Sequence, residues 1–324
     1  MAIEQKNSSG KLGRIGVLMG GPSTEREVSL KSGKAVCDSL KAHGAQIYGI
    51  DITTDNRQEN IRLIKSYDLD CAFIALHGRF GEDGQIQELL DELKIPYTGS
   101  GALASKLAMD KAASLHVFEV SGLTIPRYEV VDISSYSPSW KMRAKSGFPL
   151  VVKPANHGSS IGLSIIDEVR QLDSAVALAF SFDSRVIIQE YIPGREITVG
   201  ILDNEVLPVI EIIPSRRFFD YKAKYQPGLT DYIVPARLDE AVVKRAQETA
   251  LSAHLALGCF GCSRVDMILD KYDIPFILEI NTIPGLTQTS LLPKAAKVAG
   301  IDFTNLCIKL IELAYEKTED QTGN

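Results

Sequence analysis

Acidic and amide side chains recur at alternate positions in two apolar runs in the last quarter of the sequence. The runs are Val265–Leu269 and Pro275–Ile280, and the polar residues Lys271–Ile274 lie between them. Two apolar runs with a short polar connector are typical of a β-hairpin, and proline suits the first position of a strand. We therefore predict a hairpin in which Asp270 lies opposite Pro275.

This register places Asp266 opposite Glu279 and Arg264 opposite Asn281. Because side chains alternate along a strand, Glu279 and Asn281 share one face. Two carboxylates directly opposite each other repel, whereas a divalent cation between them would make the pair favourable. Two carboxylates and one amide are ligands that suit Mg²⁺ or Mn²⁺. We predict a metal and phosphate site here; the alternative is a solvated hairpin face with scattered charges.

A second candidate site lies near the N-terminus, where the apolar run Arg14–Met19 leads into two glycines and a helix start. Thr24 and Glu27 have the spacing of a capping box. A strand, a glycine turn and a helix N-terminus together form an anion-binding corner. The capping box puts Glu25 at the first helical position, where its carboxylate can hold a ligand ammonium. The alternative is a glutamate that simply complements the helix dipole.

A third candidate site combines a lysine with a glycine-rich loop. The predicted strand Phe148–Lys153 leads into the residues PANHGSSIG, and a second strand, Leu163–Ile166, follows. The backbone N–H groups of such a loop can lie over a polyphosphate. A lysine buried at the end of a strand needs an anionic partner. We therefore favour a phosphate site at Lys153 over a loop that is merely a mobile part of the surface.

The first 105 or so residues alternate predicted strands and helices, which indicates an α/β domain with a doubly wound parallel sheet. Within it, the strand Asp70–Leu76 ends directly before His77. Parallel sheets bind ligands at the carboxyl ends of their strands, so His77 is a candidate ligand-binding residue. A structural histidine is the alternative.

Composition and charge exclude several other classes of protein. The 324 residues have an ordinary globular composition and a formal net charge of −6, which gives no electrostatic footprint for nucleic acid or an anionic membrane. The five cysteines are odd in number and scattered, so we expect core residues rather than a disulfide framework. No apolar run approaches the ~18 residues of a membrane span. These features indicate a cytoplasmic protein.

Eight motifs occur in order along nearly the whole chain: GGPSTEREVSL, LHGRFGEDG, MDK, VVKPANHGSSIG, QEYIPGREITV, FFDYKAKY, SRVD and LEINTIPGLTQTSLLP. Together they resemble the D-alanine–D-alanine ligases, which are members of the ATP-grasp superfamily. The resemblance implies an α/β, three-domain ATP-grasp architecture, with ATP held between the central and C-terminal domains. We expect the N-terminal domain at 1–108, the central subdomain at 109–190, and the C-terminal subdomain, with the metal hairpin and a closing loop, at 191–324.

The resemblance implies a role for each matching residue at the nucleotide. Asp266, Glu279 and Asn281 match the ligands of two Mg²⁺ or Mn²⁺ ions, in agreement with the hairpin argument. Lys111 and Lys153 match the lysines that hold the ATP phosphates, and Ser159 lies in the phosphate-covering loop. The other matching ATP-binding residues are the hinge residues Gln189, Glu190 and Ile192, the ribose-binding Glu196, and Lys224.

The resemblance also implies the residues around the two amino acids. Glu25 and His77 match residues at the first D-alanine, where Glu25 holds the ammonium. Arg264 and the backbone of Gly285 match an oxyanion hole. The remaining matches are Ser290 and Leu291 at the carboxylate of the second D-alanine, and Lys224 and Tyr225 in a closing loop, where Tyr225 can hydrogen-bond to Ser159 and Glu25.

One hinge position departs from the family pattern, because many relatives carry glutamate where this chain has Gln189. Either side chain can accept a hydrogen bond from the adenine amine, so we expect ATP still to be used. Relatives that prefer D-lactate place a histidine in the closing loop. Here Tyr225 is uncharged at working pH, which favours amine attack and a dipeptide product.

The expected function is therefore ATP-dependent synthesis of D-alanyl-D-alanine, through a D-alanyl phosphate, for peptidoglycan precursors. The resemblance implies a homodimer and leaves open whether a monovalent cation such as K⁺ takes part. Two alternatives stay open: a ligase that takes D-lactate or D-serine as second substrate, and a catalytically silent nucleotide-binding module.

Overall fold

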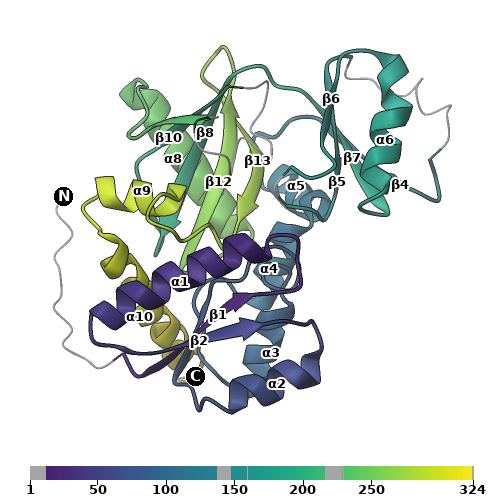
Figure 1. The fold of residues 1–324 in the computed structure, drawn as a ribbon. Coiled ribbons are helices and arrows are strands. Elements are labelled where there is room, and N and C mark those ends of the chain that lie inside the picture. The colour runs from purple at the N-terminus through teal and green to yellow at the C-terminus, as the bar shows by residue number, and fades with distance from the viewer. Residues whose placement is uncertain (1–11, 137–146, 159, 216–227, 229, 323–324) are drawn as a thin grey trace.

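Three β-sheets organise the protein, whose computed structural model describes residues 12–136, 147–158, 160–215, 228 and 230–322 (Figure 1). A parallel sheet lies in the N-terminal part of the chain, an antiparallel sheet follows in the middle, and a larger antiparallel sheet is formed by the C-terminal part. The predicted α/β class with an N-terminal parallel sheet is confirmed. Within the described residues no helix is long and apolar enough to cross a membrane.

The N-terminal sheet has the strand order β2-β1-β3, and both pairings are parallel. Ile15 and Val17 point into one core cluster and Leu18 points into another, as strand alternation requires. Helices cover both faces of the sheet, which is the predicted doubly wound arrangement (Figure 1). The elements are β1 (Arg14–Gly20), α1 (Arg26–Ala42), β2 (Gln46–Ile52), α2 (Arg57–Lys65), β3 (Cys71–Ile74) and α3 (Gln85–Leu93).

The middle sheet has the order β4-β7-β5-β6, and one of its faces packs against α6 through an apolar cluster that includes Val152 and Ile188. Val151, Lys153 and Gln189 alternate with these positions and line a cavity on the opposite face. The elements are α4 (Ala102–Met109), α5 (Lys111–Val120), β4 (Tyr128–Asp132), β5 (Leu150–Pro154), β6 (Ser164–Ile166), η2 (Val169–Gln171), α6 (Leu172–Phe180) and β7 (Arg185–Glu190).

The C-terminal sheet has the order β11-β10-β8-β12-β13, with β9 paired to β8, and α8 packs on one face. The last helix, α10, leaves this part of the chain and contacts α1 and β3, so both ends of the chain build the N-terminal layer (Figure 1). The elements are β8 (Arg195–Leu202), β9 (Glu205–Val206), β10 (Ile210–Pro214), β11 (Thr230–Ile233), α8 (Glu240–Ala256), β12 (Cys262–Leu269), β13 (Pro275–Asn281), α9 (Leu291–Val298) and α10 (Phe303–Thr322).

The predicted hairpin is present as β12 and β13. Asp266 pairs with Glu279 and Arg264 pairs with Asn281, so both predicted cross-strand pairs are confirmed. The polar connector forms the turn between the strands. The two carboxylates therefore lie opposite each other on neighbouring strands.

The predicted pairing of Asp270 with Pro275 is wrong, because Leu269 lies opposite Pro275. The register shifts by one residue next to Asp266, where Leu278 is the extra residue of a β-bulge. A bulge inserts one residue in one strand and is commonly found beside functional sites. The pair Leu269–Pro275 and the pair Asp266–Glu279 therefore belong to registers that differ by one residue. A hairpin without the bulge could not contain both pairs.

The predicted capping box at the start of α1 is also absent. The helix begins at Arg26, Glu25 is the N-cap residue, and no side chain caps the helix. The Ser23 hydroxyl instead accepts the Glu25 N–H at 3.1 Å and donates to the His77 carbonyl at 2.6 Å. Glu25 therefore lies one position earlier than predicted, at the end of the glycine turn. The cysteines match their prediction, since all five are buried and unbridged.

Candidate active site

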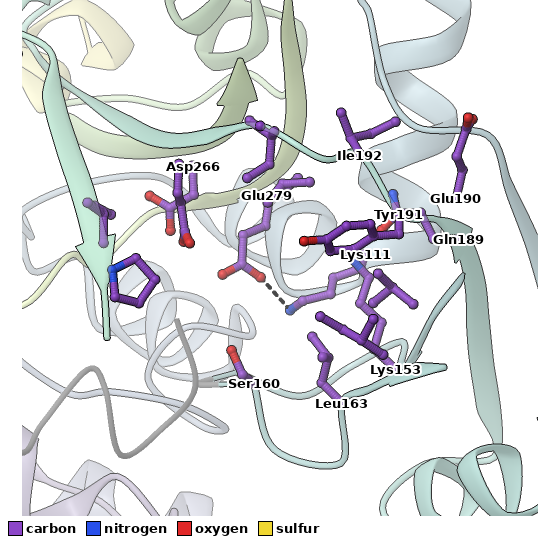
Figure 2. A pocket seen from close by; sticks show the side chains of 18 of the residues that line it. Lys111, Lys153, Ser160, Leu163, Gln189, Glu190, Tyr191, Ile192, Asp266 and Glu279 are labelled. Atoms are coloured by element: carbon purple, nitrogen blue, oxygen red, sulfur yellow. Dashed lines mark ion pairs between the residues drawn. The ribbon is translucent and has the colours of Figure 1, made fainter. Parts of the chain in front are cut away.

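Two cavities open between the three sheets, and they meet at Lys111 and Glu279. The first has a volume of about 350 Å³ and lies between the middle and C-terminal sheets (Figure 2). The second has a volume of about 600 Å³ and extends toward the N-terminal layer. Lys111 and Glu279 line both cavities, and their side chains form an ion pair of 3.2 Å. A group bound in one cavity can therefore reach a group bound in the other.

The described site residues predicted from the sequence all line one or both of these cavities. The first cavity contains Lys111, Lys153, Gln189, Glu190, Ile192, Glu196, Asp266 and Glu279. The second contains Glu25, His77, Lys111, Arg264, Glu279, Asn281, Gly285, Ser290 and Leu291. Three further predicted residues, Ser159, Lys224 and Tyr225, lie outside the described residues.

The carboxylates of the hairpin are held by cations of the chain itself. Arg264 donates from Nε and one terminal nitrogen to both oxygens of Asp266, at 2.8 and 2.7 Å. Thr198 donates to the same carboxylate at 2.6 Å. Glu279 is paired with Lys111, as Figure 2 shows. These contacts compensate two carboxylates that are largely removed from water.

The donor chemistry of this hairpin suits a hard divalent cation. Asp266 and Glu279 supply carboxylate oxygens and Asn281 supplies an amide oxygen, which here accepts the Ile283 N–H at 3.0 Å. In the described part of the chain, no three His, Cys, Asp or Glu side chains gather as a metal site. A metal site at the hairpin therefore depends on the Asn281 amide as third protein ligand.

Lys153 is a buried cation of the site with a strongly lowered pKa. Its side chain is buried at the end of β5, and this burial lowers its pKa to about 8. The negative charge of Glu279 raises the pKa and the positive charge of Lys111 lowers it, and both effects are smaller than that of burial. Lys111 also donates to the His157 carbonyl at 2.8 Å. Two ammonium groups beside one carboxylate form a site with room for further negative charge.

The hinge between β7 and β8, residues 189–192, forms one wall of the first cavity (Figure 2). Gln189 is only 2% exposed, and its Nε2 has no hydrogen-bond partner among the described residues. The Glu190 carboxylate is bound by Arg127 at 2.9 and 3.2 Å, and this hydrogen bond lowers the pKa of Glu190. The buried Nε2 group of Gln189 is thus a hydrogen-bond donor in the hinge that lacks a partner among the described residues.

Glu25 and His77 come together at the wall of the second cavity that belongs to the N-terminal layer. A Cβ at Gly78, whose φ is +71°, would lie 2.7 Å from Glu25 Oε2, so glycine is needed there. His77 Nε2 lies 3.1 Å from Ser32 Oγ, and its Nδ1 lies 3.3 Å from Glu82 Oε1. The glycine turn and the end of β3 therefore place both predicted residues on one wall of the second cavity.

The opposite wall of the second cavity is the segment that leads into α9. Ser290 is the N-cap residue of this helix, and its hydroxyl accepts the Thr287 N–H at 3.1 Å. Leu291 is the first helical residue. The N-terminus of a helix carries unpaired N–H groups and a partial positive charge, which suits a carboxylate. Gly285 and Arg264 line the same cavity.

Sequence reasoning missed several residues of the cavity walls. Leu278 lines the first cavity as the extra residue of the bulge, for which the sequence carries no signal. Arg195 binds both oxygens of Glu211 at 2.7 Å, and both residues line the same cavity. Glu211 could have been found from the sequence, since an acidic residue inside an apolar run indicates a buried charge with a specific partner. Tyr191 lies within the predicted hinge but was not singled out.

Comparisons with known proteins agree with this architecture. The family model of the D-Ala D-Ala ligase C-terminus matches residues 117–312, and that of the N-terminus matches residues 55–100. A D-alanine–D-alanine ligase from Pelotomaculum thermopropionicum is 46% identical over 312 residues, which cover 94% of this chain and 97% of the relative.

Two solved structures are similar along almost their whole length. The D-alanine–D-alanine ligase from Bacillus anthracis, crystallised with ATP, has a TM-score of 0.84 at 35% identity and covers 95% of this chain and 99% of its own. The VanG D-Ala:D-Ser ligase from Enterococcus faecalis has a TM-score of 0.80 at 33% identity and covers 93% and 99%. With the family models and the relative, they establish that this chain belongs to the D-alanine–D-alanine ligase family.

Proposed function

We propose that this protein joins two D-alanine molecules to D-alanyl-D-alanine, with cleavage of ATP to ADP and phosphate and a D-alanyl phosphate as intermediate. The observation that carries the proposal is the junction of the two cavities at the Lys111–Glu279 pair. A nucleotide cavity and an amino-acid cavity that meet at a cation are what phosphoryl transfer to a substrate carboxylate requires.

The first cavity is assigned to ATP. Gln189, Glu190 and Ile192 would contact the adenine and Glu196 the ribose, and the phosphates would extend toward Lys111 and Lys153. The B. anthracis relative was crystallised with ATP, which supports this assignment. The phosphate-covering Ser159 and the loop lysine Lys224 complete the proposed set, although both lie outside the described residues.

Asp266, Glu279 and Asn281 are proposed to hold two Mg²⁺ or Mn²⁺ ions. When bound, such ions neutralise negative charge on the phosphates. The chain's own cations share this task, because Lys111 and Lys153 face the same junction. A substrate carboxylate can approach the γ-phosphate only if this negative charge is offset.

In the first step an oxygen of the first D-alanine's carboxylate attacks the γ-phosphorus, and the bond to the bridging oxygen breaks as ADP leaves. Glu25 would hold the ammonium of this D-alanine, with His77 beside it. In the second step the neutral amine of the second D-alanine attacks the acyl carbon. The carbon–oxygen bond to phosphate then breaks, and the new amide sheds its proton to solvent.

The second step develops negative charge on the acyl oxygen. Arg264 and the Gly285 N–H are proposed to stabilise this oxyanion, and one such donor is typically worth about 3 kcal/mol. Ser290 and the first N–H groups of α9, at Leu291, would hold the carboxylate of the second D-alanine. Tyr225, which lies outside the described residues, would close over the site and exclude water.

Further parts of the proposal concern the assembly and the cell. We propose a homodimer that acts in the cytoplasm in peptidoglycan precursor synthesis, with a monovalent cation such as K⁺ as a further factor to test. The division into domains at residues 108 and 190 stays a prediction, and the contacts of α10 with α1 and β3 show that both ends of the chain share one layer.

A product panel tests the proposed function. The purified protein is given ATP and Mg²⁺ with D-alanine alone, and with equal D-alanine and either D-serine or D-lactate at pH 6 and pH 9. We expect D-alanyl-D-alanine to exceed the depsipeptide at least about tenfold at both pH values, with one ADP released per dipeptide. Products are separated by mass, and L-alanine serves as the control.

The panel also separates the alternatives. A dominant D-alanyl-D-serine product would support the specificity named for the E. faecalis structure. Depsipeptide dominating at pH 6 would overturn the amine specificity. Bound ATP without release of ADP in the presence of D-alanine would indicate a silent nucleotide-binding module.

Gln189→Glu is expected to sharpen the choice of nucleobase. A glutamine amide can donate or accept, whereas a carboxylate can only accept. Adenine offers the donor N6 and guanine offers the acceptor O6 at the equivalent position. We expect the ratio of kcat/KM for ATP to that for GTP to rise about tenfold or more in the variant. Gln46→Glu, at the exposed end of β2, is the control, and an unchanged ratio in Gln189→Glu would refute the contact.

A further inference from the structure

Ser32 lies on α1, is completely buried, and is not among the described residues that line either cavity. Its Oγ accepts the Leu286 N–H at 3.3 Å and lies 3.1 Å from His77 Nε2. The second ring nitrogen of His77 lies 3.3 Å from Glu82 Oε1. These four residues form one chain of hydrogen bonds, and its link between Ser32 and Leu286 joins residues that are 254 positions apart in the sequence.

One tautomer of His77 satisfies the donors and acceptors of this chain. The Leu286 N–H can only donate, so the Ser32 oxygen accepts. In this tautomer the Ser32 hydroxyl donates to His77 Nε2, and the proton on His77 Nδ1 points to Glu82. A fully satisfied buried network of this kind is rigid, because each group that loses its partner is left unpaired away from water.

We propose that Ser32 is a positioning residue for the amide-forming step, because it holds the backbone on which Gly285 lies. The peptide group between Gly285 and Leu286 is planar, so the bond from the Leu286 N–H to Ser32 fixes the orientation of that whole unit. The Gly285 N–H, one peptide earlier, is the proposed oxyanion donor. This inference rests on the proposed function. It gives a role in that function to Ser32, which touches no substrate.

The hydrogen bond between Ser32 and Leu286 also holds two walls of the second cavity at a fixed distance from each other. His77 and Glu82 belong to the N-terminal layer, and Gly285 belongs to the segment before α9. In the amide-forming step the amine nitrogen bonds to the acyl carbon, the carbonyl π electrons move to oxygen, and phosphate then leaves with its bonding pair. A donor that is displaced by about 1 Å from this oxygen can cost up to about a hundredfold in rate. Phosphoryl transfer forms no such oxyanion and should be affected much less.

Ser32→Ala and Ser29→Ala form a matched pair of variants. Both serines lie on α1 and both are completely buried. Ser29 donates to the Ala75 carbonyl and accepts the Gly20 N–H, so its contacts stay within the N-terminal layer. The assay uses ATP with ¹⁸O in the β–γ bridge. Scrambling of this label into the β-phosphate reports reversible phosphoryl transfer to D-alanine, and mass spectrometry of the dipeptide reports the second step.

We expect Ser32→Ala to lower dipeptide formation about tenfold and to raise the ratio of scrambling to dipeptide by a similar factor. Ser29→Ala should lower thermal stability yet leave this ratio at the wild-type value. Equal loss of scrambling and dipeptide in Ser32→Ala, or an equal rise of the ratio in Ser29→Ala, would overturn the inference. A wild-type protein that forms no dipeptide would instead refute the proposed function, so the two failures are distinguishable.

Discussion

Asp266→Asn and Glu279→Gln are each expected to lower kcat for dipeptide formation by at least about a hundredfold, which corresponds to about 2.7 kcal/mol of transition-state stabilisation. Each change keeps the shape of the side chain and removes one negative charge from the proposed metal ligands. The folded structure should persist, because Asn and Gln can still accept from Arg264 and Lys111. Steady-state kinetics at saturating ATP and D-alanine measures the loss.

Asp273→Asn is the matched control for this pair. Asp273 lies in the turn of the same hairpin with a φ of +57°, a conformation that Asn adopts as readily as Asp. It does not line either cavity in the described part of the chain. Its variant should keep wild-type kcat. Binding of Mn²⁺ with ADP, followed by electron paramagnetic resonance, gives a readout besides activity, and near-normal binding and turnover in Asp266→Asn would remove the metal assignment.

Lys153→Met is expected to abolish more than about 99% of turnover while it raises the melting temperature at pH 7. The ammonium is proposed to hold the ATP phosphates, and methionine keeps the volume of the stem without a charge. A buried charge that is only partly compensated destabilises the folded state, so its removal should stabilise it. Thermal unfolding and single-turnover ATP cleavage are measured on the same sample.

The pH dependence of this stability difference follows from the lowered pKa of Lys153. In the folded protein the pKa of Lys153 is about 8, whereas the unperturbed side chain in the unfolded chain has a pKa of 10.5. Between these values the unfolded state binds more protons, so wild-type stability gains from this group as pH rises. The advantage of Lys153→Met should therefore be largest below pH 8 and shrink toward pH 10.5.

A difference in melting temperature that stays constant from pH 7 to pH 10 would contradict the lowered pKa. Lys106→Met is a suitable control because Lys106 is exposed and pairs with Glu88. Its variant should show no gain in stability, since an exposed ammonium pays no desolvation cost.

Much of the candidate site could be predicted from the sequence because its signals are local. The alternation of apolar and polar residues around Asp266 and Glu279 predicts the two strands of the hairpin, whereas the direct pairing of the two carboxylates depends on the bulge at Leu278. The strand that ends at Lys153 and the histidine after β3 follow from the same kind of pattern. Those local signals did not extend to the Leu278 bulge or to the absent capping box before α1, because each depends on what the backbone packs against.

The sequence alone thus determined the α/β class, the hairpin with its two carboxylates, and the residue types that suit a metal, a polyphosphate and an ammonium group. Only the tertiary structure decided that the two cavities meet at Lys111 and Glu279, and that Lys111 is the counter-ion of Glu279. It also decided the link from Ser32 to Leu286. Side-chain periodicity is a property of neighbouring residues, whereas these contacts arise where separate layers pack, and no short-range pattern encodes their distance or orientation.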